Sequence, residues 1–166
     1  MSAGARFGAG RAVGGEYDGP VGRTTSGEQM TAEENKALVR RFVEEVFEKG
    51  RPDAVDELVA DDFVPHTWAS VEGREGLKRA MERVSKGLSD NRFSIEDMIA
   101  EGDRVAVRLT ASARHVGDFM GLPPSGRSYT IGEIHIFRIR DGMIVEHWHQ
   151  FDQLGLMRQL GAMPGG

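Results

Sequence analysis

Residues 127–151 read RSYTIGEIHIFRIRDGMIVEHWHQF, and this stretch decides the fold. Apolar residues recur at every second position on both sides of Asp141-Gly142. Such alternation is typical of strands with a buried face, and Asp-Gly between two strands is a strong signal for a tight hairpin turn. The stretch therefore predicts two antiparallel strands, near 127–140 and 143–151, joined at this dipeptide.

The register of this hairpin determines which side chains share a face. A two-residue turn at Asp141-Gly142 would pair position 135 with 148 and place His135 on the face opposite to His147 and His149. A three-residue loop, Arg140-Asp141-Gly142, would pair 135 with 147 and 133 with 149. We favour this loop because a single Gly late in it suits a left-handed position. One face then carries Glu133, His135, Phe137, Val145, His147, His149 and Phe151. The other carries Ile134, Ile136, Arg138, Ile144, Glu146 and Trp148.

The rest of the chain supplies helices before the strands and one helix after them. The same alternation predicts strands over 92–100 and 104–115, and apolar residues at helical spacing predict three earlier helices. The three helices are 32–48, a short one that begins near Pro52 and is closed by Asp61 and Asp62, and one from Gly73 to about Gly87. A short extended piece begins at Phe63-Val64, and Asp152 and Gly161 bound a terminal helix. This order predicts an α+β domain with helices packed on an antiparallel sheet.

Length and composition narrow the class of protein. The chain has 166 residues, enough for one domain with a sizeable core. Residues 1–29 are dense in glycine and poor in apolar residues, which predicts a flexible tail ahead of a domain over 30–163. A net charge of −5 argues against nucleic-acid binding and gives no reason for attraction to an anionic membrane. The absence of cysteine excludes thiolate chemistry and fits a reducing cytoplasm, where we expect the protein to act.

The histidines carry the functional signal. Three of the five, His135, His147 and His149, lie in the final hairpin. A strand face that mixes these rings with Glu133 and phenylalanines is a poor core, because an unpaired buried polar group costs about 1–3 kcal/mol. A pocket with apolar walls that admits water would resolve this conflict, and imidazoles that titrate near neutral pH can transfer protons there. Histidines that are hydrogen-bonded for structural reasons are the alternative.

Several short motifs belong together. The second half of the chain holds GLPPSGR at 121–127, HIFRIRDGMIVEHW at 135–148 and DQLGLMRQLG at 152–161. The first half adds DFVPH at 62–66 and GREG at 73–76. Taken together, these motifs resemble the SnoaL-like polyketide cyclases, or ester cyclases. The resemblance covers about residues 30–163, essentially everything outside the Gly-rich segment.

This resemblance implies a cone-shaped fold, shared with nuclear transport factor 2, in which a curved sheet wraps around the N-terminal helices and encloses an apolar pocket. It also implies a homodimer, and ring closure of a polyketide ester by intramolecular aldol condensation without metal or cofactor. The family's acid/base group is an aspartate directly after the tryptophan of the last strand, where this chain has His149. The family histidine on the preceding strand is kept as His135, and His66 with nearby Trp68 matches the polar position at the pocket mouth.

These observations lead to the hypothesis of a cofactor-independent acid/base enzyme that acts on a small, largely apolar, oxygenated metabolite. His149 and His135 are the expected catalytic residues. The expected substrate-binding residues are His66, Trp68, Glu133, Phe137, His147 and Phe151. Hydration, epoxide opening and double-bond isomerisation would use a similar pocket. A ligand-binding module without catalysis is the rival, because the family aspartate is lost.

Two expectations concern metals and partners. His135, His147 and His149 with Glu133 supply enough ligands for a Zn or Fe centre, but the resemblance implies none, and we expect no metal. The apolar outer face of the hairpin gives a physical reason for a homodimer. That face holds Ile134, Ile136, Ile144 and Trp148.

Overall fold

The computed structural model describes residues 30–67 and 71–163, so segment 1–29 and Trp68 lie outside the described residues. The helical elements are α1 (Ala32–Phe42), η1 (Val43–Glu48), α2 (Pro52–Leu58), α3 (Gly73–Gly87) and α4 (Gln153–Leu160). The strands are β1 (Val59–Pro65), β2 (Leu88–Glu101), β3 (Arg104–His115), β4 (Ser128–Arg140) and β5 (Met143–Phe151). The predicted α+β class, with most helices ahead of the long strands, is confirmed.

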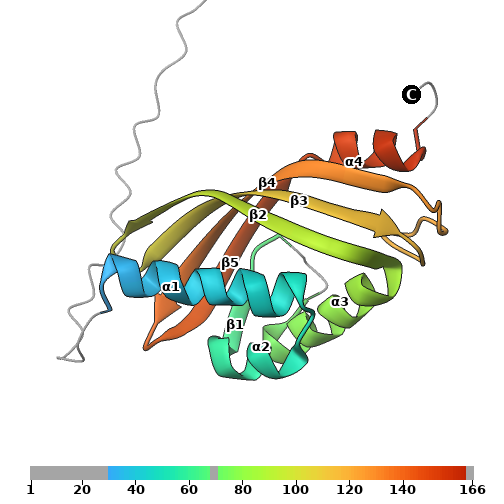
Figure 1. Ribbon diagram of the computed structural model, residues 1–166. Coiled ribbons are helices and arrows are strands. Elements are labelled where there is room, and N and C mark those ends of the chain that lie inside the picture. Colours follow the sequence, from blue (N-terminus) through green and yellow to red (C-terminus); the bar gives the residue numbers. More distant parts are fainter. Residues whose placement is uncertain (1–29, 68–70, 164–166) are drawn as a thin grey trace, which may run out of the picture.

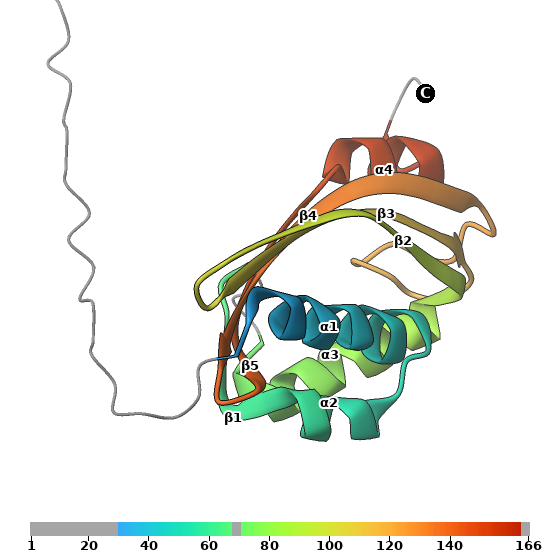
Figure 2. The same ribbon diagram turned by 60° about the vertical axis from the view of Figure 1, so that its left-hand side comes forward.

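The five strands form one curved sheet in the order β1-β5-β4-β3-β2. The sheet arches over α1, α2 and α3, which lie on its concave side (Figures 1 and 2). Strands β2 to β5 are antiparallel as predicted, but β1 pairs with β5 in parallel, so the sheet is mixed. The expected curved sheet around helices is therefore confirmed, with a parallel strand added at one edge.

Strand β1 includes residues that were predicted to form the end of the second helix. Helix α2 stops at Leu58, and Asp61 and Asp62 lie in the strand instead of closing the helix. The Arg140 guanidinium donates hydrogen bonds of 2.9 and 2.7 Å to the two carboxylate oxygens of Asp62, which ties β1 to the hairpin. Buried Phe63 anchors the strand on its other face. Pairing with β5 thus overrides the local tendency of two aspartates to end a helix.

The predicted helix over 32–48 exists but changes its winding. It starts with a capping box formed by Thr31 and Glu34. Its last six residues, η1, are π-helical. Such wider turns are frequent at functional sites. Here the π-helical turn carries Phe47, whose ring centroid lies 5.4 Å from that of His135 on β4.

The hairpin joins a tight turn to a β-bulge, a combination that neither predicted register contained. Asp141 and Gly142 have positive φ angles of 52° and 75°, so they form a two-residue turn of the kind that suits twisted strands. The register then shifts between the Arg138–Glu146 and Ile139–Ile144 pairs, which leaves Val145 as the extra residue of the bulge.

The bulge brings the three histidines to one face. The predicted pairing of 135 with 147 was wrong, because His135 pairs with His149 and Phe137 with His147. The predicted shared face was right, since the extra residue compensates for the two-residue turn. Ile144 was expected on the outer face, but the bulge turns it inward, where it is fully buried in the core.

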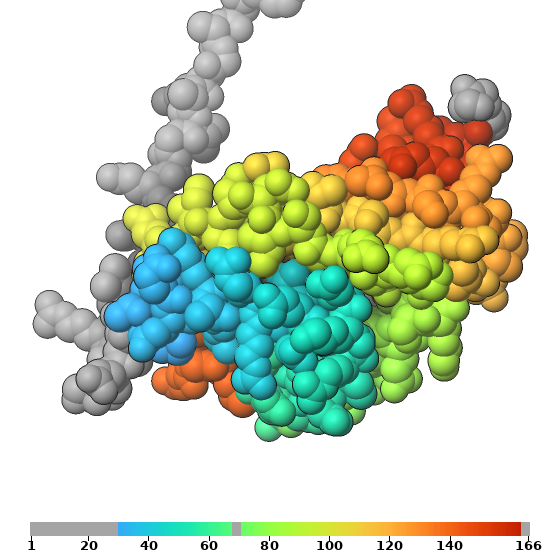
Figure 3. Space-filling model, in the orientation of Figure 1, coloured from blue at the N-terminus to red at the C-terminus, as the bar shows by residue number. Residues whose placement is uncertain are grey.

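The main core fills the space between the helices and the concave face of the sheet. Val39 and Phe42 of α1 pack in it with Phe137 and Ile139 of β4, all nearly inaccessible to solvent. In the space-filling view, α1 (blue) and β2 (yellow-green) meet over this interior (Figure 3). In the part of the chain that the structure describes, no helix is both long and apolar enough to cross a membrane.

Helix α4 covers the end of the sheet beyond β5. Asp152 caps it and Gly161 ends it in the left-handed conformation, both as predicted. The Gln159 amide bonds to both backbone groups of Thr130, where β4 runs past the end of β5. Leu156 packs there in a second apolar cluster with residues of β2, β3 and β4.

Candidate active site

One carboxylate and three imidazoles meet on the concave face of the hairpin. His135 on β4 and His147 and His149 on β5 are 1, 2 and 7% exposed. Glu133 precedes His135 by two residues on β4 and points the same way, because alternate residues of a strand share a face. Its side chain is 11% exposed. The fold thus closes the group almost entirely to water.

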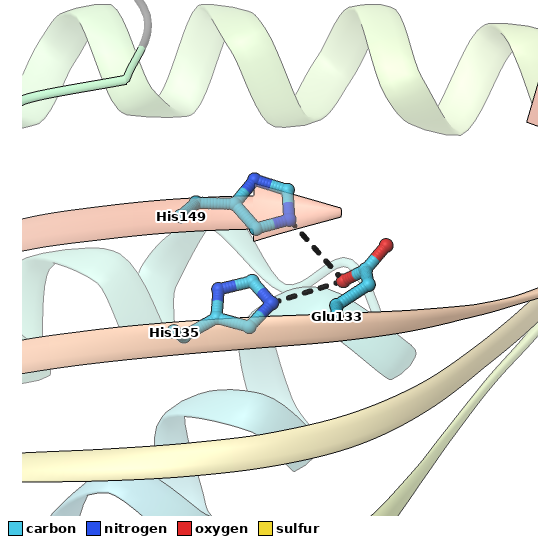
Figure 4. Close-up of side chains that lie close together, drawn as sticks. All are labelled: Glu133, His135 and His149. Atoms are coloured by element: carbon cyan, nitrogen blue, oxygen red, sulfur yellow. Dashed lines mark hydrogen bonds and ion pairs between the residues drawn. The ribbon is translucent and has the colours of Figure 1, made fainter. Parts of the chain in front are cut away.

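Glu133 is the centre of the group (Figure 4). Its Oε2 lies 2.9 Å from Nε2 of His135 and 3.5 Å from Nε2 of His149. The other carboxylate oxygen points away from both rings (Figure 4). Nδ1 of His135 lies 2.9 Å from Nε2 of His147. Both ring nitrogens of His135 are therefore engaged, one by a carboxylate and one by a second imidazole.

These contacts fix the tautomers when Glu133 is ionised. A carboxylate only accepts hydrogen bonds, so neutral His135 must donate from Nε2 and accept at Nδ1. His147 then donates from its Nε2 to His135. The result is a directed chain from His147 through His135 to Glu133, which holds the carboxylate in place.

Burial and hydrogen bonding act in opposite directions on the carboxylate. Burial alone would raise the pKa of Glu133, but hydrogen bonds and charge from His135 and His149 outweigh it and lower this pKa to about 2. Burial lowers the pKa of His135, although Glu133 opposes the shift. Burial, reinforced by the neighbouring imidazoles, lowers the pKa of His147 well below 6.5. At neutral pH the centre therefore holds an ionised Glu133 beside neutral His135 and His147.

Aromatic rings surround the group in a continuous stack. The rings of His135 and His149 are stacked with centroids 4.1 Å apart, and Phe151 stacks on His149 at 5.1 Å. Phe137 stacks on His147 at 4.6 Å. Phe151 is half-buried, whereas Phe137 is fully buried in the core. The structure thus places the Phe137 ring in the packed core.

The structure does not bring His66 into this group. Its backbone N–H donates to the His147 carbonyl at 2.8 Å, so it continues β1 along β5. Its ring stacks on Trp148 at 4.3 Å, and its Nε2 lies 2.8 Å from Glu146 Oε2. Trp148 and Glu146 alternate with His147 and His149 along β5, so their side chains lie on the outer face. The expectation that His66 shares a pocket with His149 is corrected accordingly. Trp68 lies outside the described residues.

Two residues beside the group were missed from the sequence. The Thr67 hydroxyl accepts from the His149 N–H at 2.7 Å and donates to the His149 carbonyl at 2.9 Å, which fixes the backbone there. Only the parallel pairing of β1 with β5 could have revealed it. Tyr129 is buried on the same face of β4 as Glu133, and burial and that carboxylate raise its pKa. Its alternation with Glu133 along β4 was a usable signal.

An open pocket of about 350 Å³ lies on the outer face of the sheet, near the point where β5 ends. Three neighbouring strands line it, and the exposed members of the lining alternate with the inner-face residues, so their side chains point outward. The lining residues are Arg108, Leu109, Thr110, Gly132, Glu133, Ile134, Gln150 and Phe151.

The group has the chemistry for proton transfer and a donor set for a metal ion. An imidazole beside a fixed carboxylate can take up a proton as an ion pair without leaving an isolated buried charge. Donor atoms of Glu133, His135 and His149 also lie within 4.8 Å of one another. A carboxylate with two imidazoles is a common set of ligands for divalent transition metals.

Comparison with known proteins places this geometry in a family. The sequence pattern of SnoaL-like polyketide cyclases matches residues 37–160. The chain is similar to the aklanonic acid methyl ester cyclase DauD of Streptomyces sp. (strain C5), with 33% identity over 130 residues, 75% of this chain and 80% of that protein. It is also similar to the nogalonic acid methyl ester cyclase of Streptomyces nogalater, with 33% identity over 121 residues, 69% of this chain and 89% of that protein.

A solved structure has a similar fold. TsrD from Streptomyces laurentii is 33% identical, with a TM-score of 0.76, and the match covers 81% of this chain and 100% of TsrD. The curved mixed sheet over helices is thus shared along nearly the whole described domain. The sequence match and the shared fold together show that this chain belongs to the SnoaL-like polyketide cyclase family.

Proposed function

We propose that this protein is a cofactor-independent polyketide ester cyclase that closes a ring by intramolecular aldol condensation. The observation that carries the proposal is the position of Glu133 Oε2, 3.5 Å from His149 Nε2 and 2.9 Å from His135 Nε2. Similarity to aklanonic and nogalonic acid methyl ester cyclases supports the substrate class, a small, largely apolar keto ester.

His149 is the proposed acid/base residue. Its Nδ1, the ring nitrogen that does not face Glu133, removes a proton from the carbon next to a carbonyl of the substrate, which leaves an enolate and an imidazolium. The enolate carbon then attacks a ketone of the same molecule and forms the new carbon–carbon bond. The resulting alkoxide takes the proton back from His149, so that substrate and product have the same atoms. Ionised Glu133 stabilises the imidazolium between the two steps.

Glu133 and His135 are the proposed positioning residues. His135 has no ring nitrogen left for substrate, since Glu133 and His147 occupy both. We therefore move His135 from the predicted catalytic role to that of holding the carboxylate. The Thr67 hydroxyl holds the backbone of His149 in the same way. Phe151, half-buried against His149, is the proposed apolar contact for the substrate.

The test is conversion of aklanonic acid methyl ester and nogalonic acid methyl ester by the full chain, followed by liquid chromatography with mass detection. Ring closure gives a product of unchanged mass and altered retention. We expect conversion by the wild type and loss of it in His149→Asn. Failure of the wild type to convert either ester, with the folded protein verified by circular dichroism, would sink this version of the proposal.

A binding module without catalysis is the second candidate. It is favoured by the replacement of the family aspartate with His149 and by the near-complete burial of the histidine group. Such a module would bind the same keto esters and return them unchanged. The same incubation separates the two functions, because a binder depletes free ligand in proportion to protein and an enzyme does so catalytically.

We also propose a cytoplasmic homodimer formed through the outer face of the sheet. Ile134 and Ile136 are 53 and 37% exposed there, which is unusual for neighbouring isoleucines on one strand. Light scattering during size exclusion should give twice the chain mass, and Ile134→Glu should give the monomer. A wild type that is monomeric at micromolar concentration would contradict the dimer. The lack of cysteine supports the cytoplasmic assignment, which cell fractionation tests.

A further inference from the structure

We propose that Glu133, His135 and His149 form a binding site for a divalent transition-metal ion such as Zn²⁺, and that the bound ion blocks the acid/base group. The site itself follows from geometry alone. Only the blocking effect rests on the proposed function, because it requires His149 to be the proton acceptor.

The spacing of the donor atoms fits a metal ion. Ligands about 2.0–2.1 Å from a tetrahedral Zn²⁺ lie about 3.3 Å from one another. Oε2 of Glu133 is 3.5 Å from Nε2 of His149 and 2.9 Å from Nε2 of His135. The distance to His149 already matches, and the distance to His135 needs to open by about 0.4 Å. All three donor atoms lie within 4.8 Å of one another, so the two imidazoles need to approach each other by up to about 1.5 Å. Both ring nitrogens point at the same carboxylate oxygen, so an ion between them would contact all three groups (Figure 4).

The next layer of residues suits a metal as well. A metal-bound imidazole usually donates its second N–H to a neighbouring acceptor, which fixes the ring. Nδ1 of His135 lies 2.9 Å from Nε2 of His147. On metal binding, the proton of His135 would move from Nε2 to Nδ1 and the proton of His147 from Nε2 to Nδ1, so that His135 donates to Nε2 of His147. The contact that holds His135 in the metal-free chain thus also holds it as a ligand.

Charge and access complete the case. The described ion-pair partners of Glu133 are imidazoles, so its negative charge is available to a cation. By contrast, Glu146 on the outer face is paired with the Arg138 guanidinium. The Glu133 side chain remains 11% exposed, so its carboxylate is within reach of an ion from solvent. Divalent ions late in the first transition row, Cu²⁺ and Zn²⁺, should bind most tightly to this nitrogen-rich set.

The test begins with the full chain stripped of metal by a chelator and titrated with Co²⁺, whose ligand-field absorption reports the site without any turnover. We expect saturation at one Co²⁺ per chain and displacement by Zn²⁺. Metal affinity should fall at least tenfold in each of three variants, Glu133→Gln, His135→Asn and His149→Asn. Loss of a residue that only supports a metal ligand already costs about this factor at other sites. The matched controls are His66→Asn and Glu146→Gln, which alter the other His–Glu contact of the same hairpin and should leave binding unchanged.

Each result has a defined meaning. The metal site is contradicted if the wild type shows no saturable Co²⁺ binding. It is also contradicted if the inner-face variants bind Co²⁺ as tightly as the wild type. Circular dichroism checks that each variant is folded. If the metal-free chain cyclises a keto ester, Zn²⁺ should abolish turnover and a chelator should restore it. Undiminished turnover with the site saturated overturns the blocking effect. A metal-free chain that binds Co²⁺ as expected but converts no ester contradicts the proposed function and leaves the metal site standing.

Discussion

The final hairpin carries two His–Glu contacts on opposite faces, and burial makes them different. Glu133 and His135 are 2.9 Å apart with side chains 11 and 2% exposed, whereas Glu146 and His66 are 2.8 Å apart and 21 and 36% exposed. On the outer face, Arg138 donates to Glu146 and also to Asp103, so the charge is shared in a salt-bridge network. On the inner face the partners of the carboxylate are imidazoles. The same pair of residue types is therefore a surface contact on one side and a charged centre in an apolar site on the other.

The largest expected effect is on the free energy of unfolding, which an inner-face substitution should lower much more than an outer-face substitution. Phe137 is fully buried between the helices and His147, so Phe137→Ala should lower the free energy of unfolding by about 3–5 kcal/mol. The neighbouring Ile136 is 37% exposed on the outer face, and Ile136→Ala should cost well under half as much. Urea unfolding followed by circular dichroism measures both. Equal losses would show that the outer face is buried too, for example in a dimer that persists at the concentration used.

The next effect concerns turnover and compares the two carboxylates. Glu133→Gln keeps the shape but removes the charge beside His149, and we expect turnover of a keto ester to fall about 100-fold, the loss typical of a preorganised electrostatic contact. Glu146→Gln makes the same change on the outer face and should leave turnover within about twofold. Steady-state kinetics of the two variants decide the matter. A larger loss in Glu146→Gln would place the functional site on the wrong face.

A smaller effect is the dependence of stability on pH. The pKa of His147 is well below 6.5 in the folded chain, so below pH 6.5 the unfolded chain binds a proton that the folded chain does not. The stability from neutral His147 is thus complete above this pH and declines as the pH falls. Between pH 6.5 and 5, His147→Asn should reduce the slope of unfolding free energy against pH by up to about 1.4 kcal/mol per pH unit.

The pH measurement is made with a chelator present, so that proton binding is the only ligand effect. Wild type and His147→Asn are unfolded in urea at each pH, and the slopes are compared. Parallel slopes would mean that His147 becomes protonated inside the folded chain, which its burial argues against.

Much of the fold was readable from alternation and caps. The strands of the hairpin and the cap at Asp152 followed from local signals, and the structure has both. The turn lies at Asp141-Gly142 as predicted, but it holds two residues, so the favoured three-residue loop was wrong. The register was not readable, because a bulge at Val145 has no sequence signature of its own. It forms where the twist of two long strands requires it, and its extra residue moved the partner of His135 from 147 to 149.

The candidate site was readable in part for a related reason. Glu133, His135, His147 and His149 share a face whenever the turn and any bulge together hold an odd number of residues, so the sequence could bring them together. His66 could not be assigned to a side, because that required the parallel pairing of β1 with β5 between distant segments. The same pairing hid Thr67, whose role depends on a contact with His149 across 82 positions of sequence.

The most direct test of the central claim is the turnover of His149→Asn measured beside that of His66→Asn. Each variant removes one imidazole from one face of the same strand region and leaves an amide in its place. We expect His149→Asn to lose about 10²–10⁴-fold in turnover, the range for a lost general acid/base, and His66→Asn to stay within about twofold of the wild type. Equal turnover in the two variants, whether both high or both low, would contradict the assignment of proton transfer to His149.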